Sequence, residues 1–145
     1  QRSLVGSEMC IRDRYEAARA STLNAHYTSP LVIRAIYAAV EQLGFRSGNV
    51  LEPSCGVGNF FGMLPDSMKE SRLYGVELDS ITGRIAQQLY PKAHITIAGF
   101  ETTDRRDFFD LAIGNVPFGA YQVQDKAFAR HNFLIHDYFF GATRS

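Results

Sequence analysis

Short apolar segments of strand length alternate along this chain with segments whose apolar residues follow the helical period, and this alternation limits the possible folds most. Strands are predicted at residues 49–52, 72–78, 93–98 and 108–113. Helices are predicted before the first strand, after it and after the second strand. Strands separated by helices favour a mostly parallel sheet that helices cover. The sequence therefore predicts a three-layer α/β/α domain.

The predicted helices have recognisable ends. Ser29 and Pro30 form a typical helix start, because a Ser side chain caps the first turn and Pro has no N–H to lose there. Apolar residues then follow the helical period up to Gly44, which is placed to end the helix. A later helix is expected to be capped by Ser80 and closed by Pro91. One face of that helix is predicted to carry Ile81, Ile85, Ala86 and Leu89.

The composition is that of one domain with one core. The chain has 145 residues, 46% of them hydrophobic, and a formal net charge of zero. No segment is apolar over the length needed to span a membrane. Neutrality argues against a stand-alone domain that grips nucleic acid tightly, but it allows an enzyme domain held on DNA by another region. No metal site is expected, because Cys10, Cys55 and the four histidines lack metal-ligand spacing.

A glycine-rich segment directly after the first predicted strand has the character of a cofactor loop. Gly56 and Gly58 would let a ligand approach the backbone and would free N–H groups at the start of a helix. The dinucleotide fingerprint has another Gly or Ala three residues later, where this chain has Phe61, so a nicotinamide or flavin is disfavoured. A tight packing turn is the alternative interpretation.

The ends of the next two strands carry residues that suit a nucleoside. Glu77 ends the second strand, where an acid can accept both hydroxyls of a ribose, and Leu78 would lie beside the base. After the third strand, Phe100 could pack on an adenine face and Glu101 could accept from its amino group. The alternatives are a solvated strand end for Glu77 and a core position for Phe100.

The fourth predicted strand runs into Asn115, Val116, Pro117 and Phe118. These residues suit methylation of an exocyclic amino group, whose lone pair is delocalised into the ring. The Asn side-chain oxygen and the next carbonyl could accept both N–H groups, while Pro stiffens the turn and Phe stacks on the base. Asn and Pro also make ordinary turns. However, the carboxyl ends of parallel strands share one edge, so Asn115 should lie on the same rim as Glu77.

With these motifs, residues 15–140 resemble the S-adenosylmethionine-dependent DNA methyltransferases that act on the N6 amino group of adenine. Asn115–Phe118 resembles the Asn-Pro-Pro-aromatic catalytic loop of that family, and Glu77 resembles its ribose-binding acid. His26–Pro30 resembles the segment that this class places before the cofactor loop, in contact with the methionine part. The resemblance implies that the cofactor binds Tyr27, Thr28, Pro30, Glu52, Pro53, Cys55, Gly56, Gly58, Asn59, Phe60, Glu77, Leu78, Phe100 and Glu101.

The resemblance implies a Rossmann-like class I methyltransferase fold, here incomplete at the C-terminus, and DNA whose target adenine is flipped out onto Phe118. Asn24–Pro30, Leu73–Arg84 and His131–Phe140 resemble more narrowly the methylase part of large helicase–methylase proteins of plasmids, phages and integrative elements. That match implies covalently linked helicase and target-recognition domains, a restriction–modification context, and a cytoplasmic protein encoded by a bacterium, phage or plasmid.

One residue departs from the family pattern. Val116 stands where the family usually has Pro, so the carbonyl remains but the turn loses rigidity and gains an N–H. Two other interpretations stay open. The same loop methylates glutamine amides of proteins and amino groups of RNA in other enzymes. A methylase-like module could also bind cofactor or nucleic acid without turnover.

The two ends of the chain are expected to differ from the rest. Ser3–Arg14 resembles the translation of a transposase adapter used in sequencing libraries, so residues 1–14 are expected to be a disordered segment foreign to the gene. A genuine flexible arm is the alternative. Residues 15–145 are expected to be the N-terminal part of a methyltransferase domain, cut within a helix that begins near Leu134, and to be inactive on their own.

Overall fold

The computed structural model describes residues 27–100 and 108–116. Several expectations lie outside these residues: the adapter-like segment 1–14, the C-terminal helix near Leu134, and the candidate site residues Glu101, Pro117 and Phe118. The described elements are α2 (Pro30–Gln42), β1 (Asn49–Glu52), α3 (Asn59–Gly62), the 3-10 helix η1 (Asp66–Met68), β2 (Arg72–Glu77), α4 (Ser80–Leu89), β3 (His94–Ile97) and β4 (Leu111–Ala112).

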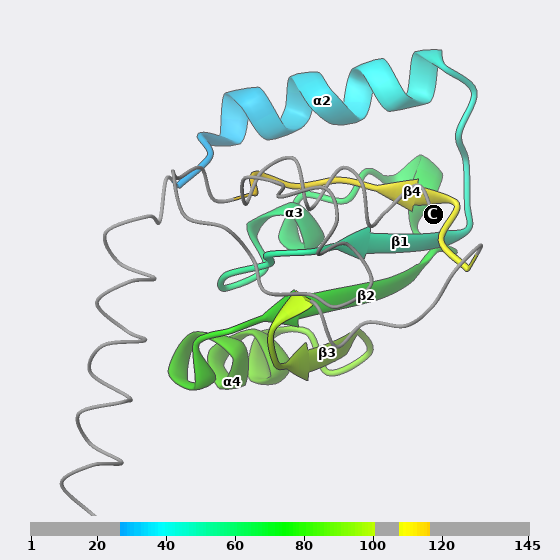
Figure 1. The fold of residues 1–145 in the computed structure, drawn as a ribbon. Helices are drawn as coiled ribbons and strands as arrows, with labels where there is room; N and C mark the ends of the chain where they lie inside the picture. Colours follow the sequence, from blue (N-terminus) through cyan, green and yellow to red (C-terminus); the bar gives the residue numbers. More distant parts are fainter. Residues whose placement is uncertain (1–26, 101–107, 117–145) are drawn as a thin grey trace, which may run out of the picture.

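The four strands form one parallel sheet in the order β3-β2-β1-β4 (Figure 1). The chain therefore moves from β1 outward through β2 to β3, and then returns to the other side of β1 as β4. Such a reversal leaves a crevice between neighbouring strand ends, and open α/β sheets bind ligands there. The predicted parallel sheet is confirmed, and β1 and β4 flank its switch point.

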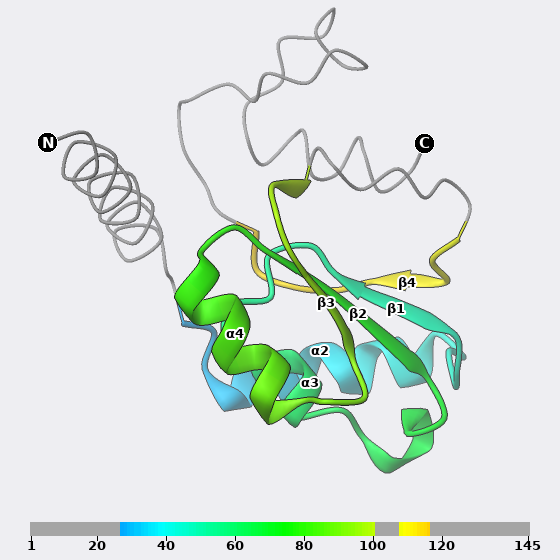
Figure 2. The same cartoon turned by 90° about the horizontal axis from the view of Figure 1, so that it is seen from below.

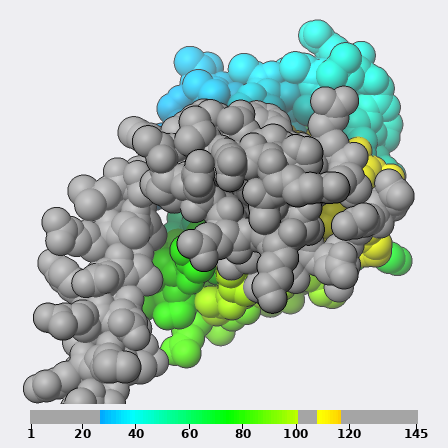
Figure 3. Space-filling view, viewed as in Figure 1, coloured from blue at the N-terminus to red at the C-terminus, as the bar shows by residue number. Residues whose placement is uncertain are grey.

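Helices α2, α3 and α4 lie on one face of the sheet, as the view from below shows (Figure 2). In the view of Figure 1, α2 runs along the top of the molecule and α4 along the bottom, and the space-filling view has the same arrangement (Figure 3). The described residues thus supply two of the three expected layers. No helix among them is long and apolar enough to cross a membrane.

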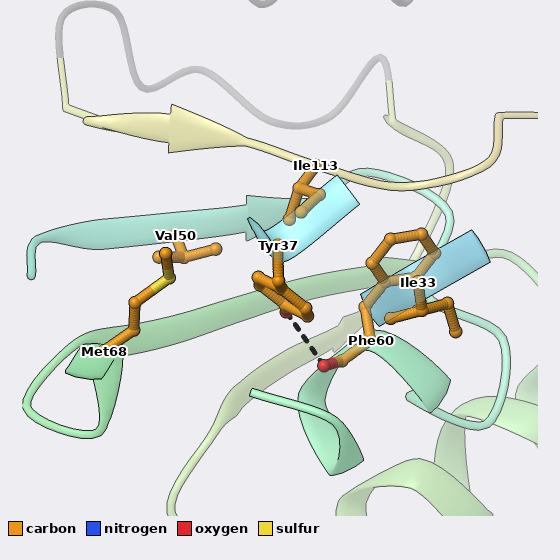
Figure 4. Packing of buried hydrophobic residues seen from close by; sticks show 6 residues of the cluster. All are labelled: Ile33, Tyr37, Val50, Phe60, Met68 and Ile113. Carbon is orange, nitrogen blue, oxygen red and sulfur yellow. Dashed lines mark hydrogen bonds between the residues drawn. The ribbon is translucent and has the colours of Figure 1, made fainter. Parts of the chain in front are cut away.

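The core under α2 joins the helix to the centre of the sheet. Ile33 and Tyr37 are buried on one side of α2, where they pack with Val50 of β1 and Phe60 of α3 (Figure 4). The Tyr37 hydroxyl donates a 2.8 Å hydrogen bond to the Phe60 carbonyl oxygen, which satisfies a polar group that burial would otherwise penalise. The complete cluster of buried residues is Ile33, Tyr37, Val50, Phe60, Met68 and Ile113.

The predicted ends of α2 are confirmed. The Ser29 side chain accepts a hydrogen bond from the Val32 N–H, and Pro30 is the first helical residue. Gly44 follows the helix with a φ of 93°, a backbone conformation that residues with a Cβ rarely adopt. The local sequence therefore sets both ends of this helix.

Two predictions about α4 are wrong. Asp79 caps the helix instead of Ser80, and its side chain accepts from the Thr82 N–H at 2.8 Å. The helix faces the sheet through small residues, because Gly83 and Ala86 are its buried positions. A Cβ at Gly83 would lie only 2.8 Å from a side-chain carbon of Ile97. Of the predicted stripe only Ala86 faces the sheet, and the exposed fractions of Ile81, Ile85 and Leu89 are 61%, 45% and 58%.

Strand β4 is shorter than predicted, but hydrogen bonds to β1 hold its register at both ends. Backbone N–H groups of Asp110 and Ile113 donate to the carbonyls of Asn49 and Leu51, each at 2.9 Å. The Asp110 carboxylate also accepts from the Asn49 N–H at 2.7 Å. These bonds fix β4 against β1 and so determine where the segment after β4 leaves the sheet.

Candidate functional site

The carboxylate of Glu77 links the ends of β1 and β2. One of its oxygens accepts a 2.8 Å hydrogen bond from the N–H of Gly56, and the other accepts one of 2.8 Å from the N–H of Asp79. Glu77 is buried, with 7% of its surface exposed. The glycine loop and the acid therefore meet at the strand ends, and the acid also organises the loop.

The two glycines of the loop have different surroundings, whereas the sequence pattern predicted the same role for both. Gly56 has a φ of 55°, and a Cβ there would meet nothing within 4 Å. Gly58 has a φ of 84°, and a Cβ there would lie 2.5 Å from the ring of Tyr90. Open space on the side of Gly56 leaves room for a ligand. Gly58 instead fits the alternative interpretation of a tight packing turn, because it lies against the ring of Tyr90.

Glu52 ends β1 as a buried acid. Its exposed fraction is 3%, and its Oε2 atom has no hydrogen-bond partner. Burial, and then the negative charge of Glu77, raise the pKa of Glu52 from 4.5 to about 9. Unsatisfied polar atoms in protein interiors are uncommon and often mark a functional site.

The segment after β4 approaches the same corner. A Cβ at Gly114 would lie 3.3 Å from Cγ of Glu52 and 3.6 Å from Cδ of Pro53. The half-buried Asn115 and Val116 follow directly. The carboxyl ends of β1, β2 and β4 thus carry Glu52, Glu77 and Asn115 on one rim of the sheet, as the strand order requires.

The remaining predicted residues divide into surface and core positions. Tyr27 and Leu78 are 78% and 66% exposed, so both are accessible to a ligand. Thr28 is half-buried and Pro30 is exposed at the start of α2, and Asn59 is exposed at the start of α3. Phe60 belongs to the core cluster, so only its backbone borders the loop. The other predicted residues that are buried are Pro53, Cys55 and Phe100.

The buried Cys55 is an inert side chain in this setting. Burial, and then the charges of Glu52 and Glu77, raise the pKa of its thiol above the ordinary range. The thiolate is the reactive form of Cys, so this environment disfavours a nucleophilic role. Its side chain belongs instead to a buried apolar cluster with Phe61, Ala86 and Ile95. Within residues 27–100 and 108–116, no group of three or more His, Cys, Asp or Glu side chains could hold a metal ion.

Three residues of this corner were not singled out in the sequence. Asp79 has the signal of a helix cap, because an acid precedes the first turn of α4. Gly114 directly precedes Asn115, and a glycine is the usual residue where two segments approach closely. Tyr90 has no local signal, since its contact with Gly58 joins the end of α4 to a loop far away in the sequence.

Two relatives align with most of this chain, and no family model matches it. Over 107 residues it is 32% identical to the defense against restriction protein B of Escherichia phage P1. This alignment covers 72% of this chain but 5% of that protein. Over 93 residues it is 39% identical to the type II methyltransferase M.CvrRI of Paramecium bursaria Chlorella virus XZ-6E, which is 63% of this chain and 24% of that enzyme. The chain therefore spans only a small part of these relatives.

Solved structures have the same arrangement of strands and helices. A Listeria monocytogenes protein assigned to the class I S-adenosylmethionine-dependent methyltransferases superposes with a TM-score of 0.67 and 16% identity, over 84% of this chain and 44% of that one. The chain therefore has the fold of the class I S-adenosylmethionine-dependent methyltransferases. A Vibrio vulnificus YJ016 protein assigned as the modification subunit of a type I restriction enzyme gives a TM-score of 0.55, with 21% identity over 82% of this chain and 28% of that protein.

Proposed function

We propose that this chain is part of an enzyme that transfers a methyl group from S-adenosylmethionine to the N6 amino group of adenine in DNA. The observation that carries the proposal is the rim where the Gly56 loop, Glu77 and the segment Gly114–Val116 meet. Cofactor and target groups must lie close together for methyl transfer, because catalysis of this kind depends on positioning.

The residues at this rim fit the proposed cofactor. S-adenosylmethionine, when bound, supplies an electrophilic methyl group. The open side of Gly56 offers room, and the Glu77 carboxylate offers acceptor oxygens for a ribose beyond the two N–H groups that it already holds. The unpartnered Oε2 of Glu52 offers a further acceptor. Exposed Leu78 and buried Phe100 follow β2 and β3, where they would border the base.

The target amine would be held by the segment that follows β4. In this proposal the side-chain oxygen of Asn115 and the carbonyl of Val116 accept the two N–H groups and turn the lone pair toward the methyl donor. Phe118 would stack on the base, which is worth about 1–3 kcal/mol. No general base is needed before methyl transfer, because the nitrogen becomes cationic and loses its proton afterwards. Val116 leaves this turn less rigid than Pro would.

The relatives support DNA as the substrate. One is named as a type II methyltransferase and the other as a protein of defence against restriction. In the full-length protein, further domains would bind DNA and recognise its sequence, which agrees with the zero net charge of this chain. The proposal includes a linked helicase domain, on the resemblance to the helicase–methylase proteins.

The test uses the full-length protein that contains this chain. It is incubated with tritiated S-adenosylmethionine and adenine-containing duplex DNA, and the labelled DNA is digested to nucleosides. Label in N6-methyl-2′-deoxyadenosine, absent in an Asn115→Ala variant, is the expected result. Label only in a protein glutamine or in RNA would overturn the choice of substrate. Cofactor binding without label in any acceptor would indicate a module without turnover.

A further inference from the structure

Glu52 is the unusual feature of this rim, and the proposed function uses it only as a further acceptor. It is a carboxylic acid at the carboxyl end of β1, in the interior, with an oxygen that no hydrogen bond satisfies. A buried acid of this kind costs free energy when ionised unless a positive charge or hydrogen-bond donors compensate it.

Within residues 27–100 and 108–116, the ionisable groups that interact with Glu52 offer no such compensation. Its charged and ionisable neighbours within the described residues are Glu77 from β2, Tyr37 from α2, Cys55 from the loop and Tyr90 from the end of α4. All four are acids, so each is neutral or negative. Each carboxylate oxygen of Glu77 already accepts one hydrogen bond from a backbone N–H. The pKa of Glu52 rises to about 9 as a result, from burial first and from Glu77 second.

We propose that Glu52 carries a proton in the ligand-free protein and releases it when a positively charged group of the cofactor binds beside it. The O–H bond of the carboxylic acid breaks, the proton passes to solvent or buffer, and the carboxylate is left paired with the cation. This inference rests on the proposed function, because S-adenosylmethionine has two cationic groups, an ammonium and a sulfonium. A neutral nucleoside ligand would leave the proton in place.

Proton release has a direct calorimetric readout that does not depend on turnover. The chain is titrated with S-adenosylmethionine at pH 6.5 in two buffers that differ in ionisation enthalpy, and the difference in heat gives the protons released. About one proton per bound ligand is expected, since the acid is fully protonated in this range. Below about pH 7.7 the α-amino group of the ligand stays charged, so it does not contribute to the count.

Two controls separate the proton step from binding itself. The neutral thioether nucleoside 5′-methylthioadenosine should bind without release. Glu52→Gln should bind S-adenosylmethionine without release, and its binding of the neutral nucleoside confirms that the variant is folded. From pH 5.5 to 7, affinity for S-adenosylmethionine should rise by up to about tenfold per pH unit in the unaltered chain and stay flat in the variant.

The outcomes distinguish this inference from the proposed function. Binding of S-adenosylmethionine to the unaltered chain with no proton released would overturn the role of Glu52. Equal release by the unaltered chain and by Glu52→Gln would overturn it as well, because another group would then be titrating. Failure of both S-adenosylmethionine and the neutral nucleoside to bind would remove the proposed cofactor, and the proton step with it.

Discussion

The carboxylate of Glu77 holds the N–H of Gly56 at 2.8 Å, so the acid at the end of β2 orders the loop that follows β1. Its second oxygen holds the N–H of Asp79, at the start of α4. A single side chain therefore joins two strand ends and a helix start. A residue with this position affects the shape of the rim as well as any ligand bound there.

Replacing Glu77 should weaken cofactor binding and stability together. Glu77→Ala leaves the N–H groups of Gly56 and Asp79 without their partner, and each lost bond to a charged acceptor is worth roughly 1.5–3 kcal/mol. We expect affinity for S-adenosylmethionine, measured by calorimetry, to fall at least about tenfold, and the free energy of unfolding to fall as well. Asp66→Ala, on the exposed surface of η1, is the control. Unchanged affinity in Glu77→Ala would refute the ribose assignment.

The two loop glycines should respond differently to the same change. Gly58→Ala should destabilise the chain by about 2 kcal/mol or more, because its methyl group meets the Tyr90 ring and its φ is positive. Gly56→Ala has a positive φ but open space, so its cost should be about 1 kcal/mol. Urea unfolding measures both. In a double-mutant cycle, Tyr90→Ala should recover part of the loss in Gly58→Ala and none of that in Gly56→Ala.

The stability of the chain should fall as the pH rises through the neutral range, on account of Glu52. Its pKa is about 9 in the folded protein against an ordinary 4.5. Below pH 4.5 Glu52 is therefore protonated in the folded and the unfolded state, and its full contribution to stability is present. Above that pH only the unfolded state loses the proton, and folding loses up to about 1.4 kcal/mol per pH unit until pH 9. Denaturant unfolding should therefore find Glu52→Gln increasingly more stable than the unaltered chain from pH 5 to 8. A difference that does not vary with pH would contradict the raised pKa.

Helix α4 should tolerate polar residues where its sequence suggests a core. Ile85 is 45% exposed whereas Ala86 is fully buried, although they are adjacent. Ile85→Lys should change the free energy of unfolding by less than about 0.5 kcal/mol. Ala86→Leu should cost about 1–3 kcal/mol, because the added carbons have no space between helix and sheet. Thermal unfolding of the two variants and of the unaltered chain measures both effects. A larger loss in Ile85→Lys than in Ala86→Leu would show that Ile85, and not Ala86, faces the sheet.

Much of the scaffold could be predicted from local patterns. The alternation of strand and helix segments predicted a parallel sheet, and Ser29, Pro30 and Gly44 predicted both ends of α2. Asp79 and Ser80 are equally good capping residues, so local sequence does not distinguish them, and the predicted cap lies one position after the observed one. The error on the face of α4 has a different cause. Periodicity finds stripes of large apolar residues, whereas this helix packs through Gly83 and Ala86.

By itself, the sequence determined the order of the elements and the positions of Gly56, Glu77 and Asn115 at strand ends, because capping, turn chemistry and hydrophobic period act between near neighbours in the chain. Only the tertiary structure decided that Glu77 holds the loop, that Gly58 lies under Tyr90, and that Glu52 is buried without a partner. Those relationships arise when β1, β2 and β4 pair and α4 packs on them, so they depend on contacts between residues far apart in sequence.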